Sequence, residues 1–341
     1  MSRGSIPQNT PILRIRHSWL YGRDVCKAGR IAHNQQEDAM DFIPSLEWIT
    51  NPTVLARQFM AGLSNGALLF LVAAGLSLIF GVSRIINFAH GAVYMLGAYF
   101  AWTVVGAASR SPLAFAAAIV FATLASFVFG VLFEMLFLRR IYRSEQAFQL
   151  LVTFALVLIL GDAVRLIWGR EENSGLVPAG LEGAVRIFGV VMPTYRIFLI
   201  AVGALVCITL WRVLYRSRIG VLIRAATVDR DMLKALGVRT DRIFTLVFGL
   251  GCGLAGLAGG LSVPIVSVGP GLHSQVLIEA FAVVVIGGMG SFPGALVGAF
   301  LLGQANAFGV LAAPALAIVL PFLVMTLVLM FRPLGLFGRP D

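Results

Sequence analysis

The chain has 341 residues, of which 59% are apolar and only 12% are charged, about half of the roughly 25% that is usual in soluble domains. So few charges could not cover the surface of a soluble protein of this size, and the composition therefore predicts a polytopic membrane protein. Soluble enzymes, nucleic-acid-binding proteins and disordered scaffolds are excluded. The formal net charge of +10 fits a membrane protein whose cytoplasmic loops collect arginine and lysine.

The first stretch of the chain, residues 1–50, is polar and basic and has no continuous apolar run. A secretory signal peptide contains about 7–15 consecutive apolar residues, so this stretch is not one. We expect it to be a poorly ordered basic tail.

Apolar segments follow one another from residue 59 to residue 331. A helix needs about 20 apolar residues to cross roughly 30 Å of hydrocarbon. The segments predict an all-α integral membrane protein of about eight transmembrane helices, with glycine-rich segments that are broken or re-entrant. The predicted spans are Phe59–Gly81, Ile86–Ala108, Leu113–Leu138, Ala147–Trp168, Tyr195–Tyr215, Ile243–Val266, Val276–Gly303 and Val310–Phe331.

The distribution of basic residues predicts the orientation of these spans. The connection Arg216–Arg242 carries seven basic and three acidic residues, so we place it in the cytoplasm. Arg139 marks a second cytoplasmic turn, and the acidic loop Gly169–Thr194 belongs on the other side. Arg332 also favours the cytoplasm, which requires an even number of crossings after residue 242. We therefore predict that Val276–Gly303 is a hairpin that enters and leaves on one side.

Two glycine-rich stretches interrupt the apolar pattern, one at Gly81–Gly91 and the other at Gly287–Gly294. The run Gly287–Gly294, with its glycines and Pro293, cannot form a stable helix, and the earlier stretch is a similar break. Paired interruptions in the two halves of a chain are typical of the transport site in many carriers. The residues expected to break the helices are Gly81, Gly91, Gly288, Gly290, Pro293 and Gly294.

The sequence contains no motif for binding a nucleotide or a metal ion. Neither Lys27 nor Lys234 follows a glycine, so the phosphate-binding loop Gly-x-x-x-x-Gly-Lys cannot be built. The four histidines are scattered and no HExxH motif occurs, so we expect no metal site. If ATP drives this protein, another chain must bind it.

Few ionisable residues lie within the predicted spans, where they are costly and by default indicate function. Glu134, one turn before Arg139, can reach the membrane surface, and Asp162 and Arg165 neutralise each other. A single further carboxylate, Glu279, does not provide the series of acids that a proton-coupled carrier needs, so the energy source lies outside this chain. The candidates for the translocation pathway, or alternatively for hydrogen bonds between helices, are Asn87, His90, Gln275, Glu279 and Gln304.

The basic loop over residues 219–238 has apolar residues at positions 219, 222, 223, 226 and 233, close to a period of 3.6. This spacing predicts a short amphipathic helix, with Gly237 placed to cap it. Such a helix either lies on anionic lipid or presents itself to a cytoplasmic partner.

Four motifs together identify a family. They are the run Arg84–Gly91, the loop from Arg224-Ala225 to Ala235-Leu236-Gly237-Val238, the run Gly287–Ala295 and the C-terminal Arg332–Gly338. From about residue 54 onward, the chain resembles the LivH-type permeases of bacterial ABC importers for branched-chain amino acids. The transmembrane permease domain is therefore expected over residues 54–341. Because Met40–Thr53 reads like an ordinary permease N-terminus, translation beginning at Met40 is a further hypothesis.

The resemblance implies binding-protein-dependent transport across the bacterial inner membrane. The expected partners are a second, related permease, two cytoplasmic ATPase subunits that use the ATP, and a periplasmic substrate-binding protein. This chain itself is expected to bind no cofactor and no nucleic acid. The residues that resemble the segment docking on an ATPase are Arg224, Ala225, Ala235, Leu236 and Gly237.

On resemblance alone, the expected substrates are hydrophobic branched-chain amino acids. Relatives of similar architecture carry urea, amides or other small organic compounds, so these substrates are the alternative. A stand-alone channel or secondary carrier would work without an ATPase. An intramembrane enzyme would need a buried catalytic pair, and the pairings of His90 with Asn87 and of His273 with Glu279 lack a matched nucleophile.

Overall fold

The computed structural model describes residues 51–107, 111–142, 144–175, 177–187 and 190–338. The basic tail over residues 1–50 and the hypothesised start at Met40 lie outside these ranges. The described chain is almost entirely helical, with one short β-hairpin, which confirms the predicted all-α class of membrane protein.

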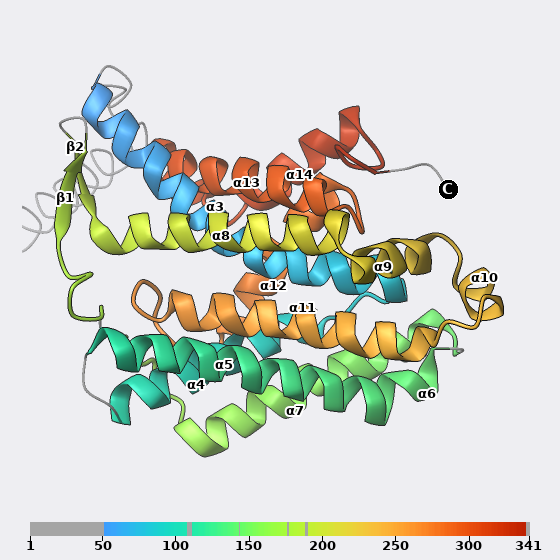
Figure 1. Ribbon diagram of the computed structural model, residues 1–341. Coiled ribbons are helices and arrows are strands. Elements are labelled where there is room, and N and C mark those ends of the chain that lie inside the picture. Colours follow the sequence, from blue (N-terminus) through green and yellow to red (C-terminus); the bar gives the residue numbers. More distant parts are fainter. Residues whose placement is uncertain (1–50, 108–110, 143, 176, 188–189, 339–341) are drawn as a thin grey trace, which may run out of the picture. The chain divides into compact units, whose positions relative to one another are not determined.

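The elements follow one another in a simple up-and-down order (Figure 1). The helices are α3 (Pro52–Ser83), α4 (Ala89–Ala107), α5 (Pro112–Phe133), a π-helical segment (Glu134–Leu138), α6 (Arg139–Ile141), α7 (Gln146–Trp168), α8 (Thr194–Arg216), α9 (Arg218–Val228), α10 (Arg230–Ala235), α11 (Thr240–Ser262), α12 (Leu272–Gly287), α13 (Phe292–Ala312), a 3-10 turn (Pro314–Leu316) and α14 (Leu320–Phe331). The antiparallel hairpin consists of β1 (Ala184–Ile187) and β2 (Val190–Pro193).

Six of the described helices are long and apolar enough to cross a membrane. They are α3, α7, α8, α11, α13 and the continuous helix Pro112–Ile141, which is made of α5, the π-helical segment and α6. Helices α12 and α14 have only 16 and 12 residues, too few at about 1.5 Å per residue to cross roughly 30 Å. The expected count of eight full spans is therefore not confirmed.

The last predicted span, Val310–Phe331, is wrong. Helix α13 continues to Ala312, the chain turns through the 3-10 segment, and α14 begins only at Leu320. The physical reason is Pro314: it lacks a backbone N–H and forces the preceding Ala313 out of the helical region, to φ −154° and ψ 79°.

The predicted hairpin over Val276–Gly303 is confirmed. Helices α12 and α13 pack antiparallel and are joined by a turn over residues 288–291. Four helical segments, α11 to α14, thus follow the basic connection, and this even number returns the chain to the end of the bundle where α9 lies.

The bundle has two chemically different ends. We call the end formed by α6, α9, α10 and the C-terminal segment over residues 332–338 the basic end; it lies on the right in Figure 1. The opposite end carries the β-hairpin and a bridge between Asn173 and Val268. The predicted placement of Arg139, the loop over residues 216–242 and Arg332 at one end of the bundle is confirmed.

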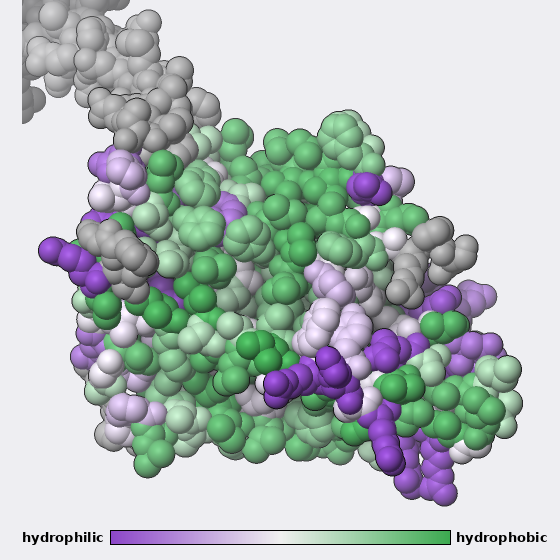
Figure 2. Space-filling view, turned by 45° about the horizontal axis from the view of Figure 1, so that its top comes forward, coloured by the Kyte–Doolittle hydropathy of each residue, from purple (hydrophilic) through white to green (hydrophobic). Residues whose placement is uncertain are grey.

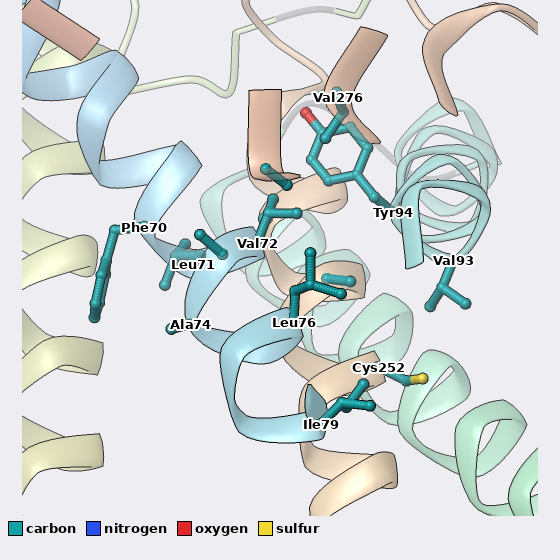
Figure 3. Close-up of a cluster of buried hydrophobic side chains, with 14 of the residues drawn as sticks. Phe70, Leu71, Val72, Ala74, Leu76, Ile79, Val93, Tyr94, Cys252 and Val276 are labelled. Carbon is teal, nitrogen blue, oxygen red and sulfur yellow. The ribbon is translucent and has the colours of Figure 1, made fainter. Parts of the chain in front are cut away.

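Helix α3 forms the centre of the bundle and packs against α8, α11, α12 and α13. Figure 3 shows side chains from α3, α4, α11 and α12 gathered in one cluster, which includes Leu76, Tyr94 and Cys252. Close approach of the backbones depends on glycine: a Cβ placed at Gly97 of α4 would overlap the backbone of Gly256 in α11. Small residues at such contacts let helices pack tightly without a strong hydrophobic driving force in lipid.

The outer faces of the bundle are apolar. Helices α5, α7 and α8 expose large apolar side chains, among them Leu124, Leu158 and Leu205. Figure 2 shows apolar residues over the middle of the visible face and hydrophilic residues toward its two ends. This distribution is the one expected for a bundle whose sides face lipid.

Candidate functional site

The first break lies between α3 and α4. Helix α3 runs through Gly81 to Ser83, and its last turn is closed by Arg84, whose backbone N–H donates to the carbonyl of Phe80 at 2.8 Å. Arg84 has φ 56°, a left-handed conformation that costs a non-glycine residue about 1–3 kcal/mol. Gly81 is therefore not itself a breaking residue, and the prediction for it is corrected. A Cβ at Gly81 would make only an ordinary van der Waals contact with Gly290, 3.4 Å from its Cα.

After Arg84 the chain is non-helical to Phe88 and returns alongside α3, so that α4 begins beside the middle of that helix. Nε2 of His90 donates to the carbonyl of Val72 at 3.0 Å; the ring nitrogen carries the proton because a carbonyl only accepts. The predicted breaker Gly91 lies in the first turn of α4, where a Cβ would overlap the carbonyl of His273. The segment is thus re-entrant, as expected.

Asn87 and His90 are both buried at the start of α4. Oδ1 of Asn87 accepts from the backbone N–H of Ala89 at 3.1 Å, which caps the helix. Nδ2 of Asn87 and Nδ1 of His90 have no hydrogen-bond partner among the described residues. These candidates therefore combine a structural role with one open donor and one open acceptor.

Gln275 and Glu279 lie one turn apart on α12, and the two side chains interact. Tyr94 of α4, one turn after His90, contacts Ser262 and lies near the Glu279 carboxylate. Four polar side chains from α4, α11 and α12 thus meet in one place. Sequence reasoning missed Tyr94 and Ser262; the spacing of four residues between positions 90 and 94 was the available signal.

Gln304 does not belong to this group. Its Nε2 donates to the carbonyl of Phe59 at 3.1 Å, and its side chain fills the space beside Gly62 on α3. The Phe88 ring lies 5.6 Å from that of Phe281 on α12, so the re-entrant segment and α12 are neighbours. The structure therefore brings four of the five predicted pathway residues to the α4–α12 region and leaves Gln304 between α3 and α13.

The second break is the turn between α12 and α13. Gly288 and Gly290 have φ of 97° and 77°, values that favour glycine, so both predicted breaks are confirmed. Pro293 and Gly294 lie in the first turn of α13, where proline's missing N–H is tolerated, and Ser291 Oγ accepts from the N–H of Gly294 at 3.1 Å.

The C-terminal segment closes this turn from outside. The backbone N–H groups of Leu336 and Phe337 donate to the carbonyls of Ile286 and Gly287 at 2.9 and 3.0 Å. These bonds satisfy carbonyls that the end of α12 leaves without a helical partner.

The amphipathic loop consists of two helices, α9 and α10, where the sequence predicted one. Asp229 separates them, because its carboxylate accepts from the N–H groups of Asp231 and Met232 at 3.0 and 2.9 Å and so starts α10. Gly237 ends α10 with φ 81°, and Val238 N–H donates to the carbonyl of Leu233 at 3.2 Å. The predicted cap is confirmed.

One face of these helices is buried through Ile223, Ala226 and Leu233. On the exposed side stand Val228, Met232 and Leu236, with exposed fractions of 78%, 60% and 72%. We call these three residues the apolar ridge. Val228 ends α9, and Met232 and Leu236 lie one turn apart at α10. Exposed apolar side chains that are surrounded by charge at the basic end are typical of a protein-binding surface.

The residues predicted to couple to an ATPase have different positions within the loop. Arg224 turns back to the bundle: Nη1 donates to the carbonyl of Leu214, and the guanidinium lies 5.2 Å from the centre of the Tyr215 ring. Ala225 is half-buried, whereas Ala235 and Leu236 are exposed. Arg224 therefore anchors α9 to α8, and the end of α10 is available for contact.

A buried carboxylate connects this loop to the bundle. Glu134, expected to reach the membrane surface, is fully buried and accepts from Thr245 Oγ1 at 2.6 Å and from the Tyr142 hydroxyl at 3.1 Å. Arg139 forms an ion pair with it at 3.7 Å. We call these four residues the Glu134 network. The expected pairing of Asp162 with Arg165 is confirmed, at 3.0 Å.

The network reaches α10 through Tyr142. The guanidinium of Arg230 lies 4.4 Å from the centre of the Phe244 ring and 5.7 Å from that of Tyr142. Burial and then the Glu134 carboxylate raise the pKa of Tyr142, so that its hydroxyl stays protonated and keeps donating.

Over residues 58–329 the chain matches the family described as the permease component of branched-chain amino acid transport systems. The chain belongs to this family. The permease is 32% identical to BraD of Pseudomonas aeruginosa, a high-affinity branched-chain amino acid transport system permease protein, over 84% of this chain and 96% of that one. LivH of Escherichia coli, a protein of the same description, is 29% identical with the same coverage. Among solved structures, PsaBC from Streptococcus pneumoniae matches 85% of the permease and 95% of that chain, with 13% identity and a TM-score of 0.46.

Family membership and the six helices able to cross a membrane make the permease a multi-pass protein of the inner membrane.

Proposed function

We propose that this permease is the transmembrane subunit of an ABC importer that moves branched-chain amino acids across the bacterial inner membrane. The observation that carries this proposal is the match to the branched-chain amino acid permease family over residues 58–329. The proposed partners are a second, related permease, two cytoplasmic ATPase subunits and a periplasmic binding protein.

The apolar ridge is the proposed contact with an ATPase subunit. The ridge is exposed, lies at the basic end and is carried by α9 and α10, which are anchored to the bundle at both sides. Arg224 holds α9 to the end of α8, and Arg230 holds α10 to Phe244 on α11 and to Tyr142. A displacement of the ridge would therefore move these helices together.

Transport follows from a two-state equilibrium that ATP binding biases. The binding protein delivers the substrate from outside, ATP binding closes the ATPase subunits, and the loop transmits this closure to α8 and α11. The pathway runs beside Tyr94, Gln275 and Glu279, where a carboxylate and neutral polar groups are available to an ammonium group. The open Nδ2 of Asn87 and Nδ1 of His90 lie in the neighbouring segment.

The test is a purification of the tagged permease from its native membranes in mild detergent, followed by reconstitution in proteoliposomes. We expect an ATPase and a second permease to co-purify, and uptake of leucine, isoleucine and valine to require ATP and the binding protein. Uptake without ATP would identify a secondary carrier. ATP-dependent uptake of urea or amides in place of amino acids would contradict the proposed substrate class and leave the importer assignment intact.

A further inference from the structure

A cavity of about 430 Å³ opens at the basic end, beside the ridge. Its walls come from three parts of the chain. They are residues 82–84 at the end of α3, residues 142, 144, 146 and 149 before and at the start of α7, and residues 226–230 at the α9–α10 junction. The volume lies in the range of small-ligand sites, about 300–1,000 Å³. Val228 of the ridge and the anchoring residues Arg230 and Tyr142 are among its lining residues.

Two arginines line the cavity, Arg84 from α3 and Arg230 from α10. Within the described residues, neither guanidinium forms an ion pair. Arg230 is held in place by the rings of Phe244 and Tyr142. Two guanidinium groups from separate parts of the chain line one space, and such groups favour an anion with several oxygen acceptors.

The backbone of Arg84 supplies an independent observation. The position needs φ 56°, which glycine adopts without cost, yet an arginine occupies it. A strained residue that lines a cavity suggests that its side chain has a task there.

One acidic residue, Asp229, also lines the cavity. Asp229 uses its carboxylate to accept two N–H groups at the start of α10. The other polar residues of the lining are neutral: Ser83, Tyr142, Ser144, Gln146, Gln149 and Thr227. Gln149 donates to the carbonyls of Ile141 and Ser144, both at 3.1 Å. Two arginines against the one carboxylate of Asp229 give the described lining a net formal charge of +1, and its other polar groups are neutral.

We propose that this cavity binds a phosphate group, contributed either by free phosphate or a phosphate ester, or by the headgroup of an anionic phospholipid. The two arginines hold the phosphate oxygens, and the neutral side chains complete the contacts. Because the walls belong to α3, α7 and the α9–α10 junction, the bound phosphate joins the centre of the bundle to the loop that carries the ridge. Occupancy would therefore restrain movement of that loop.

The test uses the full-length permease purified in detergent, with inorganic phosphate as the probe. Its thermal unfolding midpoint is measured against phosphate concentration at constant ionic strength, with chloride as the balancing anion. Two variants remove one guanidinium each: Arg84→Asn, since asparagine tolerates positive φ, and Arg230→Gln. The matched control is Arg140→Gln, an exposed arginine at the same end that does not line the cavity.

A second arm measures the same proteins in nanodiscs of phosphatidylcholine with and without phosphatidic acid. We expect phosphate or phosphatidic acid to raise the midpoint of the wild type and of Arg140→Gln, with an apparent affinity at least tenfold weaker in Arg84→Asn and Arg230→Gln. A response to phosphate identifies the free anion, and a response to phosphatidic acid alone identifies the lipid.

Equal responses in all four proteins, or no response in either arm, would overturn the proposal. A second result would also overturn it: both variants lose a co-purifying ATPase while their response to the anions matches that of the wild type. In that case the two arginines would bind an acidic side chain of the ATPase and not a phosphate. Since binding is measured on the permease alone, its failure is distinct from a failure of amino acid uptake.

Discussion

The hydroxyl of Thr245, in the second turn of α11, donates a 2.6 Å hydrogen bond to the carboxylate of Glu134, which lies 111 residues earlier in the π-helical continuation of α5. The same hydroxyl accepts from Arg139 at 2.8 Å. One small side chain thus connects an acid and a base at the point where two long helices meet the basic end. A buried carboxylate that loses such a partner keeps its desolvation cost and loses the compensating bond.

Replacement of Thr245 by valine should destabilise the permease by about 1–3 kcal/mol, because the buried Glu134 loses a donor while the shape of the side chain is retained. The measurement is the thermal unfolding midpoint in detergent. The matched control is Thr209→Val, since among the described residues the exposed Thr209 hydroxyl bonds only to the Leu205 carbonyl of its own helix. A Thr245→Val midpoint no lower than that of the control would show that Glu134 does not depend on this bond.

Arg224→Glu should abolish most ATP-driven uptake while the protein still inserts in the membrane. The substitution removes the donor to the Leu214 carbonyl and the contact with the Tyr215 ring, so that α9 is no longer fixed to α8. Gly237→Pro should act in the same direction, because Gly237 has φ 81° and proline is restricted to about −65°. Uptake in proteoliposomes is compared with that of Arg140→Glu, which makes the same charge change in an exposed residue of α6. Normal uptake by both variants would remove the coupling assignment.

Leu236→Ser and Met232→Ser should weaken recovery of the ATPase without lowering the unfolding midpoint of the isolated permease. Both side chains are largely exposed, so that removing them costs the folded chain little, whereas a partner would lose apolar contact area. Leu334→Ser changes another exposed leucine at the basic end and serves as the control. Full recovery of the ATPase with a Met232 and Leu236 double variant would contradict the assignment of the ridge.

Gly288→Ala should lower both the unfolding midpoint and uptake. Gly288 has φ 97°, and a Cβ there would overlap the backbone of Gly338 in the C-terminal segment. Gly161→Ala is the control, because the space around Gly161 within α7 is open and alanine favours a helix by about 0.5–1 kcal/mol over glycine. Equal unfolding midpoints and equal uptake in Gly288→Ala and Gly161→Ala would show that the turn tolerates a side chain at position 288. The C-terminal segment would then not depend on a glycine there.

Glu279→Gln should reduce uptake of branched-chain amino acids about tenfold or more, since a hydrogen bond to a charged group contributes roughly 1.5–3 kcal/mol. The change retains size and hydrogen-bonding capacity and removes the negative charge near Tyr94. Asp162→Asn, which removes a carboxylate from an exposed pair, is the control. A normal KM and rate in Glu279→Gln would exclude this carboxylate from the pathway.

The features that the sequence predicted correctly depend on local chemistry. Apolar length places α3, α5, α7, α8 and α11, and glycine density places the turn at residues 288–291. The cap at Gly237 follows from a single residue type at the end of an amphipathic stretch. Each of these features can be recognised within one or two helical turns.

The features that the sequence did not predict depend on contacts between distant segments or on one overlooked residue. The buried Glu134 is paired with Thr245, and the sequence around either residue contains no signal that predicts this pairing. The basic loop forms two helices, and this could have been predicted because aspartate, as at Asp229, commonly starts a helix. The spacing of the apolar residues alone does not reveal the break. Helix α14 is short because Pro314 ends the preceding helix. The sequence prediction followed the hydropathy of the segment and gave Pro314 too little weight.

The bonds from Leu336 and Phe337 to Ile286 and Gly287 impose an order on biogenesis. These donors leave the ribosome only after α13 and α14 have been synthesised, so that the carbonyls at the end of α12 wait unpaired while the intervening helices are inserted. The turn between α12 and α13 therefore gains these two backbone hydrogen bonds only after the last described segment has been synthesised.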